Sequence, residues 1–146
     1  MTLEQLVTDL ATSRQLRDKD FPQDTAFSWY PADSPEDAET VGQDLGKEFI
    51  KHDAFVFMTG ECDDFICAAP TAEEILKELP LFLDKGRHEQ LSVTKEDAFP
   101  EGDRRNGYVA DWWNNEIHGT MGGVGNKSLA EAAAHAYLWW KKEVAG

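Results

Sequence analysis

The chain has 146 residues, of which 41% are hydrophobic and 11% aromatic, and its net charge at pH 7 is −14. This length and apolar content predict one folded domain over residues 1–146 and exclude a chain that is disordered throughout. The acidity excludes direct binding to nucleic acids and to anionic membranes, because both need clustered lysine and arginine side chains.

The negative charge is concentrated in one part of the chain. Between Asp33 and Glu78 the sequence has 13 acidic residues and 3 lysines, so this stretch carries −10 of the total. Such a stretch either keeps the surface soluble and self-repelling, or forms a face that resembles nucleic-acid phosphates and attracts a basic partner. The charge alone leaves both interpretations open.

The two cysteines, Cys62 and Cys67, are too few for a disulfide framework. The first ten residues, MTLEQLVTDL, have neither the basic start nor the long apolar run of a secretory signal. No stretch approaches the roughly 18 consecutive apolar residues of a membrane span. We therefore expect a cytoplasmic protein with reduced thiols.

The first predicted elements are helical and are followed by a strand. Thr2 and Gln5 form a capping box, after which apolar residues share one helical face as far as Leu10. A further helical turn or two is expected before Phe21. Residues 25–30, TAFSWY, alternate in the manner of a strand that stops at Pro31.

The acidic stretch is expected to begin with a helix and to continue as a hairpin. Ser34 and Pro35 are typical of a helix start, and apolar residues at three- and four-residue steps carry the helix to Phe49, although two glycines weaken it. Residues 53–59 and 65–69 then predict two strands of a hairpin around an acidic turn.

The second half of the chain predicts strands between two capped helices. Thr71 begins a capping box for a helix that Pro80 interrupts, and residues 81–83 form a separate apolar turn. Strands are expected over 88–94 and 107–113, with 115–121 as a further pairing segment. The closing helix has Ser128 as its cap, and the apolar stripe of that helix comprises Leu129, Ala133, Ala136, Trp140 and Val144. Together these elements predict an α+β fold: an antiparallel sheet of about five strands, with the last helix covering the core.

A glycine-rich run, IHGTMGGVGNKSLAEA, precedes and enters the closing helix. It resembles a phosphate-binding loop, G-x4-G-K-[ST], in which glycines let backbone amides surround the phosphates. Aligned on Lys127 and Ser128, however, the two glycine positions are occupied by Met121 and Asn126. We therefore interpret the run as a turn that ends in a helix cap.

Metal and catalytic patterns are weak. The four histidines are scattered and form no metal-binding spacing, and the cysteine pair has no second pair to complete a zinc tetrahedron. No nucleophile elbow is present, and carboxylate pairs carry no information in so acidic a chain. We expect no metal, no cofactor and no enzymatic activity.

Three pieces of the sequence carry recognisable patterns. Residues 16–29 have P-Q-D-T before an F-x-W strand, residues 66–80 have A-P-T, a helix and L-P, and residues 129–140 are alanine-rich. They resemble the opening, the central signature and the closing helix of a family of small proteins encoded by tailed phages and prophages. The resemblance covers about half of the chain and carries no active site, and residues 33–51 and 97–105 depart from the pattern. It implies a phage-encoded protein that acts in the cytoplasm of a bacterium.

These observations lead to one main functional hypothesis. We expect the protein to bind and inhibit a host protein, such as a CRISPR–Cas defence complex or a nucleic-acid enzyme, by occupying a basic surface that normally holds DNA or RNA. The acidic face would consist of Glu36, Asp37, Glu39, Asp44, Glu48, Glu61, Asp63 and Asp64.

Two alternatives remain open. In the first, the protein sequesters a small ligand such as a nucleotide signal, with arginines pairing to phosphates and an indole stacking on the base. The residues for this site would be Arg104, Arg105, Trp112 and Trp113. Alternation along a strand would turn one of the two tryptophans to the core and the other to the opposite face, which a helix would cover or which would be free for an interface. In the second, the protein is a virion or scaffold component, which predicts a stable homo-oligomer.

Overall fold

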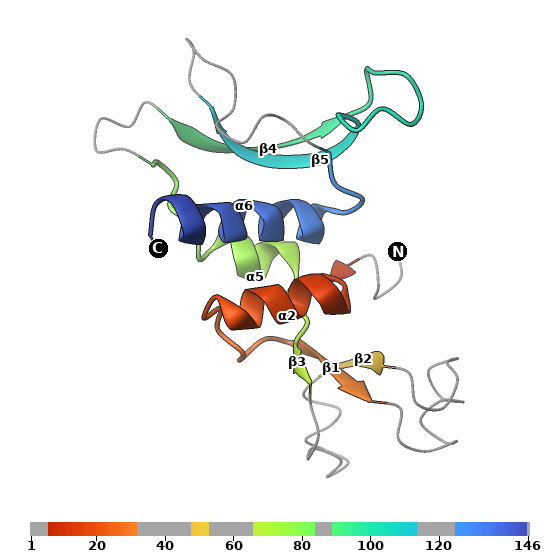
Figure 1. Ribbon diagram of the computed structural model, residues 1–146, viewed down its shortest axis with the longest axis vertical. Helices are drawn as coiled ribbons and strands as arrows, with labels where there is room; N and C mark the ends of the chain where they lie inside the picture. Colours follow the sequence, from red (N-terminus) through yellow and green to blue (C-terminus); the bar gives the residue numbers. More distant parts are fainter. Residues whose placement is uncertain (1–5, 32–47, 53–65, 84–88, 114–124, 146) are drawn as a thin grey trace. The chain divides into compact units, whose positions relative to one another are not determined.

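The computed structural model describes residues 6–31, 48–52, 66–83, 89–113 and 125–145, which divide between two compact units, Met1–Thr71 and Ala72–Gly146 (Figure 1). The first unit contains α2 (Leu10–Asp18), β1 (Phe27–Pro31), β2 (Glu48–His52) and β3 (Cys67–Ala68). The second contains α5 (Ala72–Leu76), β4 (Gln90–Glu96), β5 (Gly107–Trp113) and α6 (Leu129–Glu143). The α+β class is therefore confirmed, while the expectation of a single domain stays a prediction.

The first unit is built around a three-stranded antiparallel sheet in the order β2-β1-β3. Trp29 is the central residue of this sheet, because it lies opposite Ile50 on one side and Cys67 on the other. The helix α2 begins at an N-cap, Asp9, whose carboxylate accepts a hydrogen bond from the Thr12 amide at 2.8 Å. This bond satisfies an amide that the first helical turn leaves without a partner.

A small apolar cluster of Val7, Trp29, Cys67 and Ala69 forms the core of the first unit. The Trp29 indole N–H donates to the Ser13 hydroxyl at 3.1 Å, which ties the middle of β1 to α2. Ser13 in turn shares a buried 2.6 Å hydrogen bond with the Thr8 hydroxyl. Because buried polar groups need partners, this chain of bonds makes the polar side of the tryptophan compatible with its burial.

The second unit has three layers, with α6 between α5 and the β4–β5 hairpin (Figure 1). Alanines on several sides of α6 are buried, which lets the backbone of this helix approach both neighbouring layers closely. On the sheet side, the Trp112 ring of β5 lies 5.6 Å from the Trp139 ring of α6. The helix begins where predicted, because the Ser128 hydroxyl accepts a hydrogen bond from the Glu131 amide at 3.1 Å.

Several predicted elements are confirmed. The strand over 107–113 has the predicted bounds, the strand expected over 88–94 runs from Gln90 to Glu96, and a helix follows Thr71. The strand expected over 25–30 begins two residues later and includes Pro31 as its last residue.

Other predicted elements are wrong. The five described strands form two separate sheets rather than one. The helix expected to reach Phe49 does not, because residues 48–52 are β2, paired along their whole length with β1. Cys67 and Ala68 also pair with β1, and residues 53–59, their expected hairpin partner, lie outside the described residues. Residues 81–83 are no isolated turn, because Phe82 pairs with Gln90.

Candidate functional site

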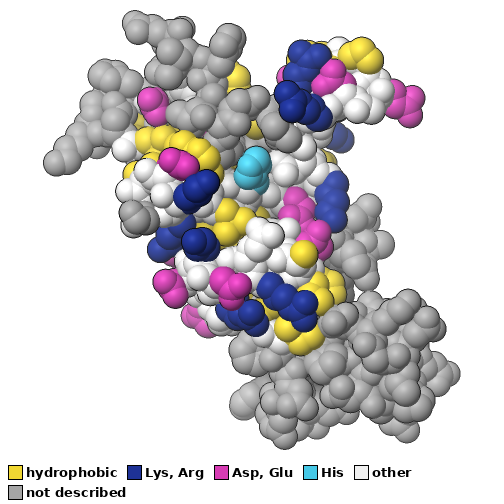
Figure 2. Space-filling model, in the orientation of Figure 1, with side chains coloured by type: hydrophobic (Ala, Val, Ile, Leu, Met, Phe, Trp, Pro, Cys, Tyr) yellow, Lys and Arg dark blue, Asp and Glu magenta, His cyan; other side chains and the backbone are white. Residues whose placement is uncertain are grey.

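The predicted acidic face lies almost wholly outside the described residues. Only Glu48 falls within them, as the first backbone position of β2. The other members lie in 32–47 and 53–65, where the structure describes nothing; they are Glu36, Asp37, Glu39, Asp44, Glu61, Asp63 and Asp64. On the face of the molecule that Figure 2 shows, basic and acidic side chains of the described residues are interspersed.

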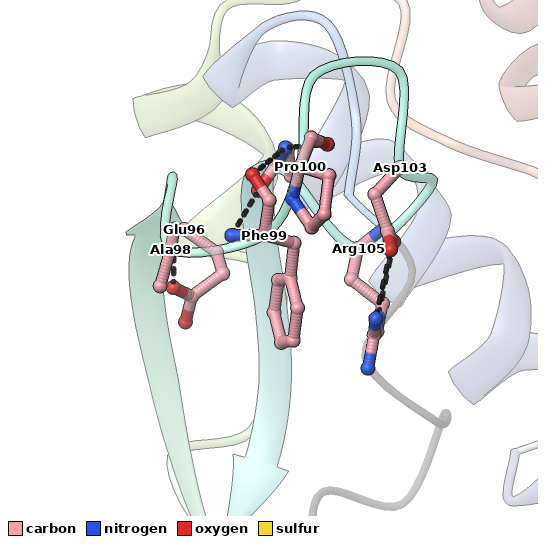
Figure 3. A network of polar contacts seen from close by, with 7 residues as sticks. Glu96, Ala98, Phe99, Pro100, Asp103 and Arg105 are labelled. Atoms are coloured by element: carbon pink, nitrogen blue, oxygen red, sulfur yellow. Dashed lines mark hydrogen bonds and ion pairs between the residues drawn. The ribbon is translucent and has the colours of Figure 1, made fainter.

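The best-defined polar site is the β4–β5 loop, residues 97–106, in the second unit (Figure 3). Asn106 closes this loop with its side-chain amide, whose nitrogen donates to the carbonyl oxygens of Phe99 and Pro100, both at 3.0 Å. Its amide oxygen accepts from the Phe99 N–H at 3.2 Å. One side chain therefore replaces the backbone pairing that ends with β4 and β5, and fixes the shape of the loop.

Asp103 and Arg105 form a bidentate ion pair in this loop. The Arg105 Nε donates to Asp103 Oδ1 at 3.0 Å and Nη2 donates to Oδ2 at 2.7 Å, while the Arg105 backbone N–H also donates to Oδ1. The guanidinium carbon lies 3.7 Å from the centroid of the Phe99 ring, so the cation stacks on the aromatic face (Figure 3). The side-chain and backbone hydrogen bonds from Arg105 lower the pKa of Asp103 to about 2, and the Asp103 carboxylate raises the pKa of Arg105.

Arg104 differs from its neighbour. Its carbonyl oxygen accepts from the Gly125 N–H at 2.8 Å, but its exposed guanidinium makes no hydrogen bond or ion pair with any described residue. Together with Gly102, Asp103 and Arg105 it lines an open hollow of about 550 Å³. Both arginines are exposed, but Arg105 is held by its ion pair with Asp103, whereas Arg104 projects into solvent.

Two glycines allow the segment before α6 to reach this loop. A Cβ on Gly107, whose φ is +118°, would come within 2.5 Å of the Asn126 carbonyl oxygen, and a Cβ on Gly125 would overlap the Asn106 carbonyl. Next to this close approach, Asn126 and Tyr108 exchange both of their backbone hydrogen bonds. The described end of the glycine-rich run is therefore a short backbone bridge to β5, followed by a helix cap. Gly119, Gly122 and Gly123 lie outside the described residues.

The four residues of the expected ligand site are not brought together. Trp112 is fully buried, and its indole N–H donates to the Pro80 carbonyl at 3.0 Å, whereas Trp113 is 37% exposed. The alternation predicted for this pair is confirmed. Arg104 and Arg105 precede the first residue of β5, and Trp113 is its last, so about 20 Å of strand separates the two pairs. Trp112 has no face left on which a base could stack.

Comparison with family models, with curated proteins and with solved structures finds no match to this chain. The described residues contain no group of three or more histidine, cysteine or acidic side chains that could hold a metal ion. Cys67 is buried, and burial raises the pKa of its thiol, so it fills space in the core of the first unit. Among the helices within the described ranges, none has the length and apolar content needed to cross a membrane.

The residues that build the loop were not predicted from the sequence. Arg104 and Arg105 were both expected to bind phosphate, although Asp103, two positions before Arg105, was a signal that this arginine has a partner within the chain. Phe99 and Asn106 gave no signal, because their contacts depend on the loop reversing its direction between the two strands.

Proposed function

We propose that this protein binds a host protein through its acidic stretch and inhibits that protein by occupying a basic, nucleic-acid-binding surface. The observation that carries the proposal is the uneven distribution of charge between the two units. Residues 1–71 contain 15 acidic and 5 basic residues, a net charge of −10, whereas residues 72–146 contain 13 and 9, a net charge of −4.

Charge of this density acts at a distance. A concentrated negative region attracts a basic surface before contact, and electrostatic attraction of this kind raises association rates by about ten-fold to a thousand-fold at low salt. A basic groove that holds DNA or RNA is the protein surface with the most complementary charge, so occupation of that groove also explains how binding would inhibit. Nucleic-acid enzymes and CRISPR–Cas defence complexes are host proteins with such grooves.

The described residues of the second unit are consistent with partner binding by the acidic first unit. Its best-defined charged pair, Asp103 and Arg105, is an ion pair within the loop. Of the two tryptophans that could stack on a base, Trp112 is in the core and the exposed Trp113 lies about 20 Å along β5 from the arginines. The nucleotide-binding alternative therefore has no assembled site among the described residues, and we do not propose it.

The test is a pull-down from bacterial lysate with the immobilised protein, at low and at high salt, followed by affinity measurements with the captured protein. Complementary charge predicts that the affinity for the captured protein falls by about ten-fold or more once the ionic strength exceeds about 0.15 M, where the Debye length is about 8 Å. DNA or RNA should compete with the protein for the same target.

A pair of matched triple variants assigns the binding surface. Glu36→Lys, Asp37→Lys and Glu39→Lys together should abolish binding and inhibition. The control, Asp97→Lys, Glu101→Lys and Glu143→Lys, changes the net charge equally at exposed positions of the second unit and should leave binding within about three-fold. Equal losses in both variants, or affinity that does not respond to salt, would contradict the proposal.

A further inference from the structure

Part of the outer edge of β4 has no backbone partner among the described residues. Leu91 donates its backbone N–H to the Leu81 carbonyl, away from β5, at 2.7 Å. Lys95 lies opposite Tyr108, whose own backbone N–H and C=O are used by Asn126 on the far side of β5. Because hydrogen-bonding direction alternates along a strand, Val93 and Lys95 also point their backbone groups away from β5.

These outward groups have no partner among the described residues. The segment 81–83 covers the edge only beside residues 89–91, and the loop begins at residue 97. The side chains at this edge are also accessible: Val93 is 41% exposed, and Thr94 and Lys95 are exposed. With no described partner for the N–H and C=O groups of Val93 and Lys95, this edge can accept a further strand.

We propose that this edge pairs with the same edge of a second copy of the chain, antiparallel and centred on Thr94. Val93 would then lie opposite Lys95 of the second copy, and each such pair exchanges two hydrogen bonds. The four outward groups of Val93 and Lys95 in each copy are satisfied in this way, and the two hairpins join into one four-stranded sheet in the order β5-β4-β4-β5.

The residues of β4 favour this register over its neighbours. Centred on Thr94, the two threonines face each other, which is a favourable cross-strand pair, and the aliphatic stem of Lys95 covers exposed Val93. Centred on Lys95, two lysines would lie directly opposite, which is destabilising. Centred on Val93, the pairing would need the Leu91 N–H, which already donates to Leu81.

The charge of the copies sets how this pairing responds to salt. Each copy carries −14, so the two repel, and the short edge gives a weak dimer. Added salt screens that repulsion and should strengthen self-pairing, whereas it weakens the proposed binding to a basic partner. The two interactions can therefore be told apart by the sign of their salt dependence.

Disulfide capture tests the register directly. In the register centred on Thr94, that residue and its symmetry mate form a non-hydrogen-bonded pair with Cα atoms about 4.5 Å apart, which a disulfide spans. We would place Thr94→Cys in a Cys62→Ser background, which leaves Cys67 as a buried thiol, and follow oxidation on non-reducing gels. The expected result is a covalent dimer that forms at least about ten-fold faster than in the background protein, and faster still at 0.3 M salt.

The matched control is Val93→Cys in the same background. Two copies of residue 93 are diagonal neighbours in this register, about 7–8 Å apart, and should cross-link poorly although the side chain is exposed. Val93→Pro added to Thr94→Cys removes one outward N–H and should slow formation of the disulfide between the two copies. Circular dichroism checks that this variant remains folded. Equal cross-linking at positions 93 and 94, or none above background at either, would overturn the proposal.

Discussion

At the scale of single residues, Gly125 shows how one hydrogen atom in place of a side chain decides whether two backbone segments can meet. Any Cβ there would overlap the Asn106 carbonyl, which is backbone and cannot rotate away. We expect Gly125→Ala to lower the free energy of unfolding by about 3 kcal/mol, at the upper end of the range for single substitutions. Urea unfolding followed by tryptophan fluorescence measures the change.

Gly102 is the control for Gly125. It has a φ of +85°, but a Cβ on it would meet nothing within 4 Å. Gly102→Ala should therefore show only the backbone strain of a left-handed residue, about 1–2 kcal/mol. If the two substitutions are equally destabilising, the close approach of Gly125 to Asn106 has no energetic consequence.

The low pKa of Asp103 makes the stability of the protein depend on pH. The hydrogen bonds from Arg105 hold this pKa at about 2, below the ordinary 3.8, so the folded state favours the ionised form. The stability linked to this group is therefore present above pH 3.8 and is lost as the pH falls from there towards 2. A carboxyl-carbon NMR titration should show the low pKa in the native protein.

The adjacent arginines provide the control for that titration. Arg105→Ala removes the side-chain hydrogen bonds, the largest cause of the low Asp103 pKa, and keeps the bond from the backbone N–H of residue 105, so the pKa should rise towards 3.8. Arg104→Ala removes only a weak charge interaction and should move it much less. Equal shifts would mean that Asp103 responds to the local positive charge and not to the bidentate pair.

The same residues show how much of a site the sequence can predict. Alternation along β5 was enough to predict that one of Trp112 and Trp113 is buried, because this property is local to a strand. The different roles of Arg104 and Arg105 were not predicted, because they depend on the turn that brings Asp103 and Phe99 to the second arginine. The acidic face rests on sequence alone, since the described residues include only the backbone of Glu48.

At the scale of elements, Ser128 fixes the start of α6. Its hydroxyl accepts from the Glu131 amide, one of the four amides that a helix start leaves unpaired. Ser128→Ala should lower the free energy of unfolding by about 1 kcal/mol, and Ser128→Asp should retain most of the cap and its stability. Thermal unfolding of the three proteins measures both effects, and a serine-to-alanine change without effect would mean that packing alone positions the helix.

The elements that the sequence predicted well are those with local signals. Capping residues and helical periodicity indicated α5 and α6, and alternation with bounding polar loops indicated β4 and β5. The failures involve pairings between distant segments: residues 48–52 and 67–68 both join β1. The apolar spacing up to Phe49 suggested a helix, but the gain from pairing with the edge of β1 outweighs that weak local preference.

At the scale of the whole molecule, net charge makes a prediction about stability as well as about partners. A charge of −14 opposes the compact state through self-repulsion, and most of it lies in the first unit. Raising salt from 20 to 300 mM shortens the Debye length from roughly 20 to roughly 5 Å and screens that repulsion. The midpoint of the first thermal unfolding transition should rise by a few degrees.

Neutral substitutions locate the origin of this salt effect. Glu36→Gln, Asp37→Asn and Glu39→Gln together should raise the unfolding midpoint at 20 mM salt and reduce its dependence on salt, because they remove charge where the chain has most of it. Asp97→Asn, Glu101→Gln and Glu143→Gln remove the same charge from the second unit, whose net charge is −4 against −10 for the first, and should change the midpoint less. If salt leaves the unfolding midpoint of the native protein unchanged, the carboxylates of residues 33–78 are already neutralised by their surroundings. Carboxylates neutralised in this way could not attract a basic partner.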